Sequence, residues 1–406
     1  MKQLGIILCT LLVLGACQTV STNPDESVVS DPKAIHIENN FDREFLNQRI
    51  DRSRIVLQPI IESENKLLNR NDADNLSILA TIENPTVPGT GIELSATSVA
   101  YDDQNEIVYV GYHANGSPIY GAIDVYDVSD TSSPSLIAQH TFDNLEFVDL
   151  DIYFKNGSGY LYTAGTTDLD TDSWYSVFHR FDIDENGEIS TSEGGFVSKY
   201  VEFGTSSSIL KYSDYVYLAT AGSNGKVLPA KKDFSKFYTD KQWTSSGTSL
   251  KYIHDYKGEM IILTNGEFYH SDIKTHNRNF SSNISWSKSF DAITPSDGKN
   301  VVSVHENNIY LSAGDNGLLV YTFDENGATL SHHYKSTAYK NLANAVCYEQ
   351  NYVYLSNGWA LSVMKSSELE TVYHYNLGLG SVNFAAVAKK LIFVAAGTGG
   401  LYILER

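Results

Sequence analysis

Residues 182–193 carry acidic and amide side chains at the spacing of a calcium-binding loop. Asp182, Asp184 and Asn186 stand at alternate positions, a glycine follows, and Glu193 closes the stretch. Hard cations such as Ca²⁺ prefer several carboxylate and carbonyl oxygens, and the glycine permits a sharp turn. However, residues 324–327 repeat the Asp-Glu-Asn-Gly core without the first aspartate. The sequence therefore leaves two interpretations open: a calcium site, or a hairpin turn in which Asn or Gly takes positive φ.

A second acidic stretch precedes it. Asp168, Asp170 and Asp172 alternate just before Trp174. Carboxylates at this spacing repel each other unless a cation lies among them. The stretch is interpreted either as a solvated acidic loop or as a site for calcium or a cationic ligand.

The sequence contains none of the common short motifs of catalytic or nucleotide-binding sites. The eleven histidines show no metal-ligand spacing, and there is no nucleophile elbow, phosphate-binding loop or dinucleotide fingerprint. Cys347 has no partner after processing of the N-terminus, and we expect it to be a buried strand residue. An active site that draws one residue from each of several repeats would escape these motifs, so an enzyme stays possible.

The N-terminus predicts lipid anchoring. Lys2 precedes an apolar run from Leu4 to Leu14, which is the length of a signal-peptide core. Residues 14–17, Leu-Gly-Ala-Cys, resemble the bacterial lipobox. This resemblance implies that residues 1–16 are a signal peptide and that Cys17 carries the lipid, including palmitate. Gln18 replaces the aspartate that retains many lipoproteins at the inner membrane, so we expect the outer membrane, at its periplasmic face or the cell surface.

Composition limits the possible partners. The formal charge is −20, which argues against nucleic acid and against docking on anionic lipid. The charge is compatible with cations, neutral sugars or basic protein surfaces. Tyrosine and glycine are abundant, as is typical of β-rich proteins.

The chain divides into four segments. After the signal peptide, residues 17–41 are polar and aperiodic, as expected of a flexible tether. Residues 42–75 predict a short helical segment, interrupted by Pro59. Residues 76–406 contain the repeats.

Residues 76–406 predict an all-β, seven-bladed β-propeller. An inner strand, a strongly apolar second strand and two further strands recur about every 48 residues between Ser95 and Ser381. The last unit ends at Arg406 without its outer strand, whereas residues 76–82 form an unmatched strand before the first unit. We therefore expect this N-terminal strand to close the ring as the outer strand of the last blade.

Three repeats resemble a known family. In the repeat of LVIVD propeller proteins, a Gly-rich turn leads into an apolar strand that ends in an acidic residue. Three segments of this chain resemble that repeat: residues 124–130, 317–324 and 399–405. Blades three and four depart from this pattern. The resemblance implies the propeller fold and says little about activity.

Two functions follow from this fold. The connections between the second and third strands are long in blades one to three, and loops elaborated on a rigid scaffold often bind ligands. The candidate binding residues are Tyr112, His113, Tyr120, Asp168, Asp170, Asp172 and Trp174. The first hypothesis is a lipid-anchored binding platform for a protein or glycan. The second hypothesis is a hydrolase or lyase with an active site in the central channel, formed by Asp149, Asp151, Asn344 and Asn383. Paired carboxylates with raised pKa values at the mouth of the channel would favour this enzyme.

Overall fold

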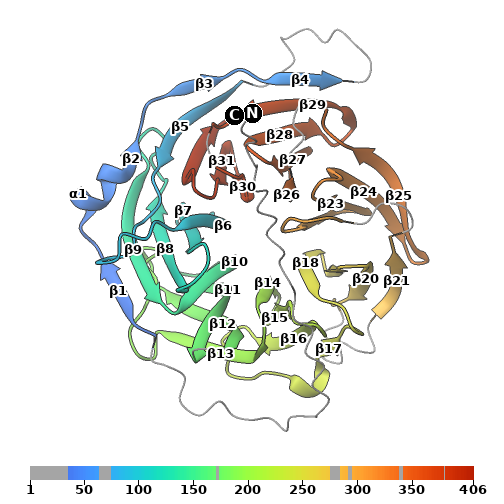
Figure 1. Cartoon of the computed structure of the whole chain (residues 1–406), viewed down its shortest axis with the longest axis horizontal. Coiled ribbons are helices and arrows are strands. Elements are labelled where there is room, and N and C mark those ends of the chain that lie inside the picture. Colours follow the sequence, from blue (N-terminus) through green and yellow to red (C-terminus); the bar gives the residue numbers. More distant parts are fainter. Residues whose placement is uncertain are drawn as a thin grey trace, which may run out of the picture. The chain divides into compact units, whose positions relative to one another are not determined.

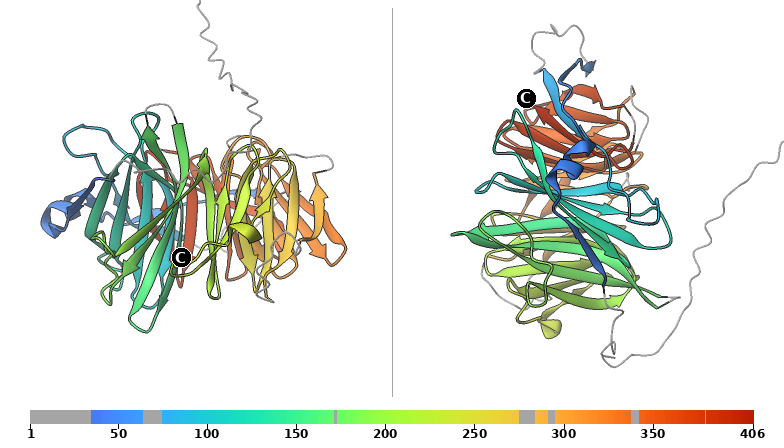
Figure 2. Two further views of the ribbon diagram at one scale, coloured as in Figure 1. Left: turned by 90° about the horizontal axis from the view of Figure 1, so that it is seen from below. Right: turned by 90° about the vertical axis from the view of Figure 1, so that its left-hand side faces the viewer.

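A computed structural model confirms the seven-bladed propeller (Figure 1). It describes residues 35–63, 75–170, 173–274, 284–290, 295–337, 342–378 and 380–406. Each blade is an antiparallel sheet whose strands we call a to d, from the central channel outward. Figure 2 shows the blades edge-on, with their strands running between the two faces of the ring. We call the face with the d–a and b–c connections the upper face, and the opposite one the lower face.

The strands follow the predicted repeats. Blade 1 contains β6 (Ser95–Asp102), β7 (Ile107–His113), β8 (Tyr120–Asp127) and β9 (Ser135–Asp143), and blade 2 contains β10 (Leu145–Lys155), β11 (Ser158–Asp170), β12 (Ser173–Ile183) and β13 (Phe196–Phe203). Blade 3 contains β14 (Ser206–Tyr212), β15 (Tyr215–Thr220), β16 (Lys226–Lys231) and β17 (Trp243–Thr244), with η3 (Thr239–Lys241) before β17. Blade 4 contains β18 (Leu250–Tyr256), β19 (Glu259–Thr264), β20 (Glu267–Asp272) and β21 (Ile284–Ser289).

The remaining blades complete the ring. Blade 5 contains β22 (Val302–His305), β23 (Asn308–Ser312), β24 (Leu318–Asp324) and β25 (Gly327–Tyr334), and blade 6 contains β26 (Ala343–Glu349), β27 (Tyr352–Asn357), β28 (Ala360–Lys365) and β29 (Glu368–Asn376). Blade 7 contains β30 (Phe384–Ala388), β31 (Leu391–Ala395), β32 (Leu401–Glu405) and β5 (Leu76–Ile82).

Blade 7 closes the ring as the sequence predicts. The N-terminal strand β5 pairs antiparallel with the C-terminal strand β32, with Ile82 opposite Leu401 and Ser77 opposite Glu405. The second strands are buried on both faces because each blade packs between two neighbours; every residue of β15 and β31 is buried. Apolar side chains from adjacent blades therefore form the core.

Residues 35–63, which we call the belt, differ from the expected tether and helix. Helical structure within them is limited to α1 (Arg43–Leu46), capped by Asp42, and the 3₁₀ turn η1 (Asn47–Arg49). The rest forms strands along the outer edges of three blades. These are β1 (Ile37–Asn40) on blade 1, β2 (Ile50–Asp51) and β3 (Ile55–Leu57) on blade 7, and β4 (Ile60–Ser63) on blade 6.

The belt takes this form because outer strands leave backbone groups unpaired, and β-branched residues in extended conformation can pair with them. Figure 2 shows the belt crossing the outer side of the blades. Cys17 and the rest of the expected signal peptide and tether up to residue 34 lie outside the described residues. In the part of the chain that is described, no helix is long and apolar enough to cross a membrane.

Candidate functional site

The upper-face residues predicted to bind a ligand lie on blades 1 and 2. Tyr112 is completely buried, and its hydroxyl lies 3.2 Å from that of Tyr126. It therefore belongs to the core and cannot contact a ligand at the surface. His113 and Tyr120 are half-buried. Burial, together with the nearby Lys299 ammonium, lowers the pKa of His113 to about 4, so this imidazole is neutral at pH 7.

The acidic stretch of blade 2 is a protruding hairpin. Strands β11 and β12 continue their ladder beyond the neighbouring blades, and Asp168 stands opposite Trp174. Trp174 is 51% exposed and Asp168 is half-buried. The side chain of Asp170 and the whole of Asp172 lie outside the described residues. The expected long loop is thus largely strand, and its ladder places Asp168 opposite Trp174 and Asp170 opposite Ser173.

The candidate calcium loop has the geometry of a hairpin turn. Oδ1 of Asp184 accepts hydrogen bonds from the backbone N–H groups of Asn186 and Glu188, each at 2.9 Å. Asp324 caps its matching turn in the same way, accepting from Asn326 N–H at 2.7 Å. Asp182 pairs with the Arg180 guanidinium at 2.7 Å.

Glu193 forms an isolated parallel bridge with Phe196. Within the described ranges, no group of three or more His, Cys, Asp or Glu residues is arranged to hold a metal ion. The described geometry favours the turn interpretation, and the calcium site stays a prediction.

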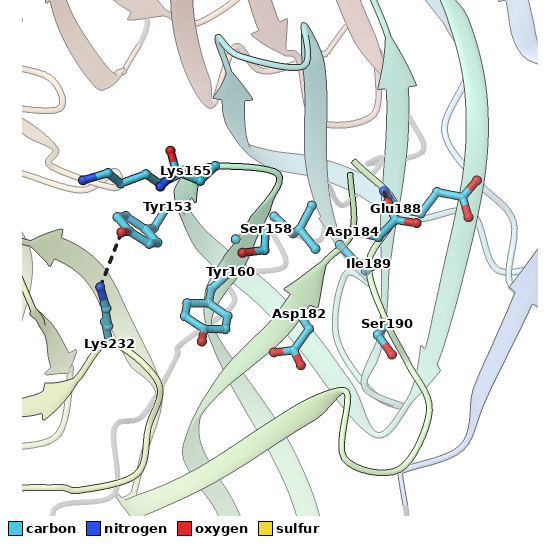
Figure 3. Close-up of a pocket in the computed structure, with 13 residues that line it drawn as sticks. Tyr153, Lys155, Ser158, Tyr160, Asp182, Asp184, Glu188, Ile189, Ser190 and Lys232 are labelled. Carbon is cyan, nitrogen blue, oxygen red and sulfur yellow. Dashed lines mark hydrogen bonds between the residues drawn. The ribbon is translucent and has the colours of Figure 1, made fainter. Parts of the chain in front are cut away.

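The same turn borders a pocket on the lower face, between blades 2 and 3 (Figure 3). The pocket has a volume of about 750 Å³, which is in the usual range of ligand sites. Its walls come from the a–b and c–d turns of blade 2 and the c–d turn of blade 3. The lining side chains are mostly polar: Tyr153, Lys155, Asn156, Ser158, Tyr160, Asp182, Asp184, Glu188, Ser190 and Lys232, with Ile183 and Ile189.

Blade 1 holds the far wall of this pocket in place. The buried Tyr109 hydroxyl donates a 2.7 Å hydrogen bond to the Gly187 carbonyl. Gly187 has φ +82°, and a Cβ there would lie 2.5 Å from the Ile107 side chain. Glycine is therefore required both for the turn and for its close approach to blade 1. The turn is consequently fixed rather than free to close over the pocket.

Cations and tyrosines alternate along the near wall. The Tyr153 and Tyr160 rings are nearly parallel, with centroids 6.4 Å apart. The Lys232 and Lys211 ammoniums lie 4.8 and 4.3 Å from the Tyr153 centroid, and the Arg180 guanidinium lies 4.7 Å from that of Tyr160. Such cation–π contacts hold aromatic side chains in fixed positions. Figure 3 places Lys155 and Lys232 at one end of the pocket and Asp184 and Glu188 at the other.

The central channel contains buried carboxylates, as the enzyme hypothesis requires. Asp149 is 2% exposed and accepts from Ser208 Oγ at 2.8 Å, Ile209 N–H at 3.1 Å and the Tyr252 hydroxyl at 3.3 Å. Burial raises the pKa of Asp149 to about 6, against the attraction of Lys299. Burial also raises the pKa of Asp151 to about 7, although the N–H groups of Lys211 in blade 3 and of Ile152 donate to it.

These polar groups also join neighbouring blades. Inner strands are sheet edges, so their N–H and C=O groups need side-chain partners. Asp149 and Asp151 supply acceptors for blade 3, Asn344 Nδ2 donates to Val382 O of blade 7, and Asn383 Nδ2 donates to Ala96 O of blade 1. The four predicted channel residues therefore lie around the channel in blades 2, 6 and 7, and each has a structural role.

Two other reactive groups are enclosed. Ser362 Oγ lies 2.8 Å from His374 Nδ1, and His374 Nε2 lies 3.0 Å from a Glu62 oxygen of the belt. This order of groups resembles a hydrolytic triad, but Ser362 and His374 are completely buried, so the cluster ties the belt to blade 6. Cys347 is half-buried in β26, where burial raises the pKa of its thiol to about 12.

Comparison with known proteins supports the fold alone. No protein-family model and no curated protein matches the chain. The crystal structure of Saccharomyces cerevisiae Sqt1 is similar with a TM-score of 0.54 at 9% identity, covering 80% of this chain and 99% of that chain. The crystal structure of Chaetomium thermophilum Sqt1 has a TM-score of 0.52 at 10% identity, and the match covers 78% of this chain and 96% of that chain. The crystal structure of a catalytically inactive H270A virginiamycin B lyase from Staphylococcus aureus with quinupristin is also similar. Its TM-score is 0.53 at 9% sequence identity, and the match covers 80% of this chain and 98% of that chain.

Sequence reasoning missed the lower-face pocket, although a signal for part of it was present. When the repeats are aligned on their inner strands, an aromatic residue lies within the last three residues of that strand in blades 1 to 6. These residues are Tyr101, Tyr153, Tyr212, Tyr256, His305 and Tyr348. In contrast, nothing in the sequence indicates that the 182–190 turn faces Tyr153.

Proposed function

We propose that this chain is a bacterial lipoprotein of the LVIVD propeller type, anchored to the outer membrane through Cys17, and that its propeller binds a glycan in the lower-face pocket. The observation that carries the proposal is the lining of that pocket. Carboxylates, ammoniums, an amide and hydroxyls line it together with two tyrosine rings and two isoleucines. Sugars present many hydroxyls that both donate and accept hydrogen bonds, so such a lining suits them better than it suits an apolar ligand.

A protein partner is the alternative outcome. The exposed Trp174 on the upper face supports it, since tryptophan is frequent at the energetic centres of protein interfaces. Two tyrosines distinguish the faces: Tyr160 in the pocket and Tyr120 on the upper face are both half-buried. Tyr160→Ala and Tyr120→Ala therefore form a matched pair.

The test is isothermal titration of the purified propeller with soluble muropeptides and with lipopolysaccharide core oligosaccharides. We expect saturable binding that Tyr160→Ala weakens at least about ten-fold, which corresponds to about 1.4 kcal/mol, and that Tyr120→Ala leaves unchanged. Binding weakened only by Tyr120→Ala would move the site to the upper face. No binding of either glycan, together with capture of one defined envelope protein by the wild type and not by Trp174→Ala, would replace the glycan by a protein.

Anchoring is tested separately by labelling cells with radioactive palmitate. Wild-type protein should incorporate the label and stay with outer membranes after a high-salt wash, whereas Cys17→Ala should be unlabelled. Equal labelling of both proteins would contradict anchoring through Cys17 without affecting the pocket.

A central-channel enzyme is the second candidate, because Asp149 and Asp151 have the raised pKa values that acid–base catalysis uses. Mass spectrometry of the same glycans after incubation with the protein tests it. A binding platform leaves their masses unchanged. Cleaved or unsaturated products that disappear in Asp151→Asn would instead support a hydrolase or lyase.

A further inference from the structure

The inner strands carry β-bulges at their upper ends. In β6 the pairing with β7 shifts between Ala96 and Ser98, which leaves Thr97 as the extra residue, and in β10 it shifts between Phe147 and Asp149, which leaves Val148. Equivalent shifts occur in blades 3, 4 and 6. A bulged residue is released from its ladder. On an inner strand, the carbonyl of such a residue is available to a group in the channel.

A lysine from a distant blade uses two of these carbonyls. Lys299 lies in the connection that leads into β22 of blade 5. Its Nζ donates hydrogen bonds to the Thr97 and Val148 carbonyls, each at 2.8 Å. Blade 5 is adjacent to neither blade 1 nor blade 2, so this side chain joins parts of the ring that are not neighbours.

The surroundings of this ammonium suit a cation. The Phe384 ring of blade 7 has its centroid 5.6 Å from Nζ, and aromatic faces attract cations at such distances. The buried Asp149 attracts the same charge, although burial lowers the pKa of Lys299 to about 8. The neighbouring His113 is neutral at pH 7 and does not repel it. Carbonyl oxygens, an aromatic face and one carboxylate therefore converge on the ammonium from blades 1, 2 and 7.

We propose that the upper mouth of the channel is a binding site for a primary ammonium group, which the chain fills with its own Lys299 and thereby braces blade 5 against blades 1 and 2. An ammonium is the fitting occupant because it offers three N–H donors, of which two reach carbonyls. A quaternary ammonium has the charge without these donors. This site is separate from the lower-face pocket and does not depend on glycan binding.

The first test uses the wild-type protein and amine acetylation followed by mass spectrometry. Lys335 is the control, because it is an exposed lysine in the next d–a connection. Reaction at Lys299 requires the brace to open, and we expect it to be more than about ten-fold slower than at Lys335. Equal rates at the two amines would overturn the proposal.

The second test separates the ammonium site from mere packing. Lys299→Met keeps the length of the side chain, and we expect it to lower the melting temperature while Lys335→Met does not. In Lys299→Ala, methylammonium should restore part of the lost stability, and tetramethylammonium at equal concentration should not. Equal effects of the two ions, or no loss of stability in either Lys299 variant, would show that the carbonyls do not form an ammonium site.

Discussion

Arg49 of the belt should be one of the most sensitive positions for the stability of the propeller. Its guanidinium inserts into blade 1 and lies 2.7 Å from Asp124 Oδ2, with side-chain exposures of 13% and 0%. It also donates to Gln139 Oε1 at 2.8 Å and twice to the Glu83 carbonyl. Burial alone would lower the pKa of Arg49, but its interactions with Asp124, Tyr126 and Tyr112 together outweigh this effect and raise it. We therefore expect Arg49→Met to be severely destabilising.

The magnitude follows from what remains after the substitution. Asp124 would keep its 2.8 Å hydrogen bond from the Tyr126 hydroxyl, but its charge would be buried without a counterion. Removing one partner of a buried ion pair costs about 3–5 kcal/mol, whereas removing both charges costs much less. Arg54→Met is the matched control, because Arg54 pairs with Glu405 while 63% of its side chain is exposed, and exposed pairs contribute about 0–1 kcal/mol.

The assay is urea unfolding followed by circular dichroism and by tryptophan fluorescence. We expect Arg49→Met to lose about 3–5 kcal/mol, Arg54→Met to lose less than about 1 kcal/mol, and Arg49→Met/Asp124→Asn to be more stable than Arg49→Met. A loss at Arg49 no larger than at Arg54 would refute the reasoning. So would a double variant as unstable as the single one, because the unpaired charge would then not be the cause.

Three further predictions concern pH, ring closure and calcium. The native pKa of Asp149, about 6, exceeds its ordinary value of 3.8. The protonated carboxyl therefore contributes up to about 3 kcal/mol to the free energy of unfolding, which is complete below about pH 4 and lost as pH rises through about 6. Asp149→Asn should flatten this decline in urea titrations between about pH 4 and 6, and an unchanged slope would contradict the shift. Deleting residues 18–34 should leave the melting temperature unchanged, whereas deletion through Ile82 should cause aggregation because it exposes the edge of β32; equal melting temperatures would contradict closure by β5. Because Asp184 and Asp324 cap their turns alike, calcium and magnesium at equal ionic strength should raise the melting temperature equally, and a calcium-specific rise lost in Asp184→Ala and kept in Asp324→Ala would restore the metal site.

The fold could be predicted because repetition makes its pattern visible. Each blade needs strands that are apolar on both sides, and the orphan strand at residues 76–82 had a single vacant position, beside Leu401. The belt could not be predicted in the same way. Strands such as Ile55–Leu57 are short and pair with an edge that the sequence does not identify, so local pattern left helix and strand undecided.

The site was less predictable than the fold because it depends on which turns meet. Tyr112 was expected in the b–c loop at the surface, but β7 extends through it to His113, and its side chain is completely buried. The pocket joins residues 153–160, 182–190 and 232 across two blades. Likewise, the contact of Lys299 with Thr97 and Val148 spans much of the chain, and only the closed ring brings these residues together.

Hydrogen–deuterium exchange of the propeller, with and without the muropeptide or oligosaccharide that binds it, tests the proposed binding site most directly. We expect the bound glycan to slow exchange in residues 153–160 and 182–190, which supply most of the lining of the lower-face pocket. Exchange in the upper-face segments 113–120 and 166–170 should stay unchanged. Protection of those upper segments, with none around Tyr160 and the 182–190 turn, would contradict a glycan site on the lower face.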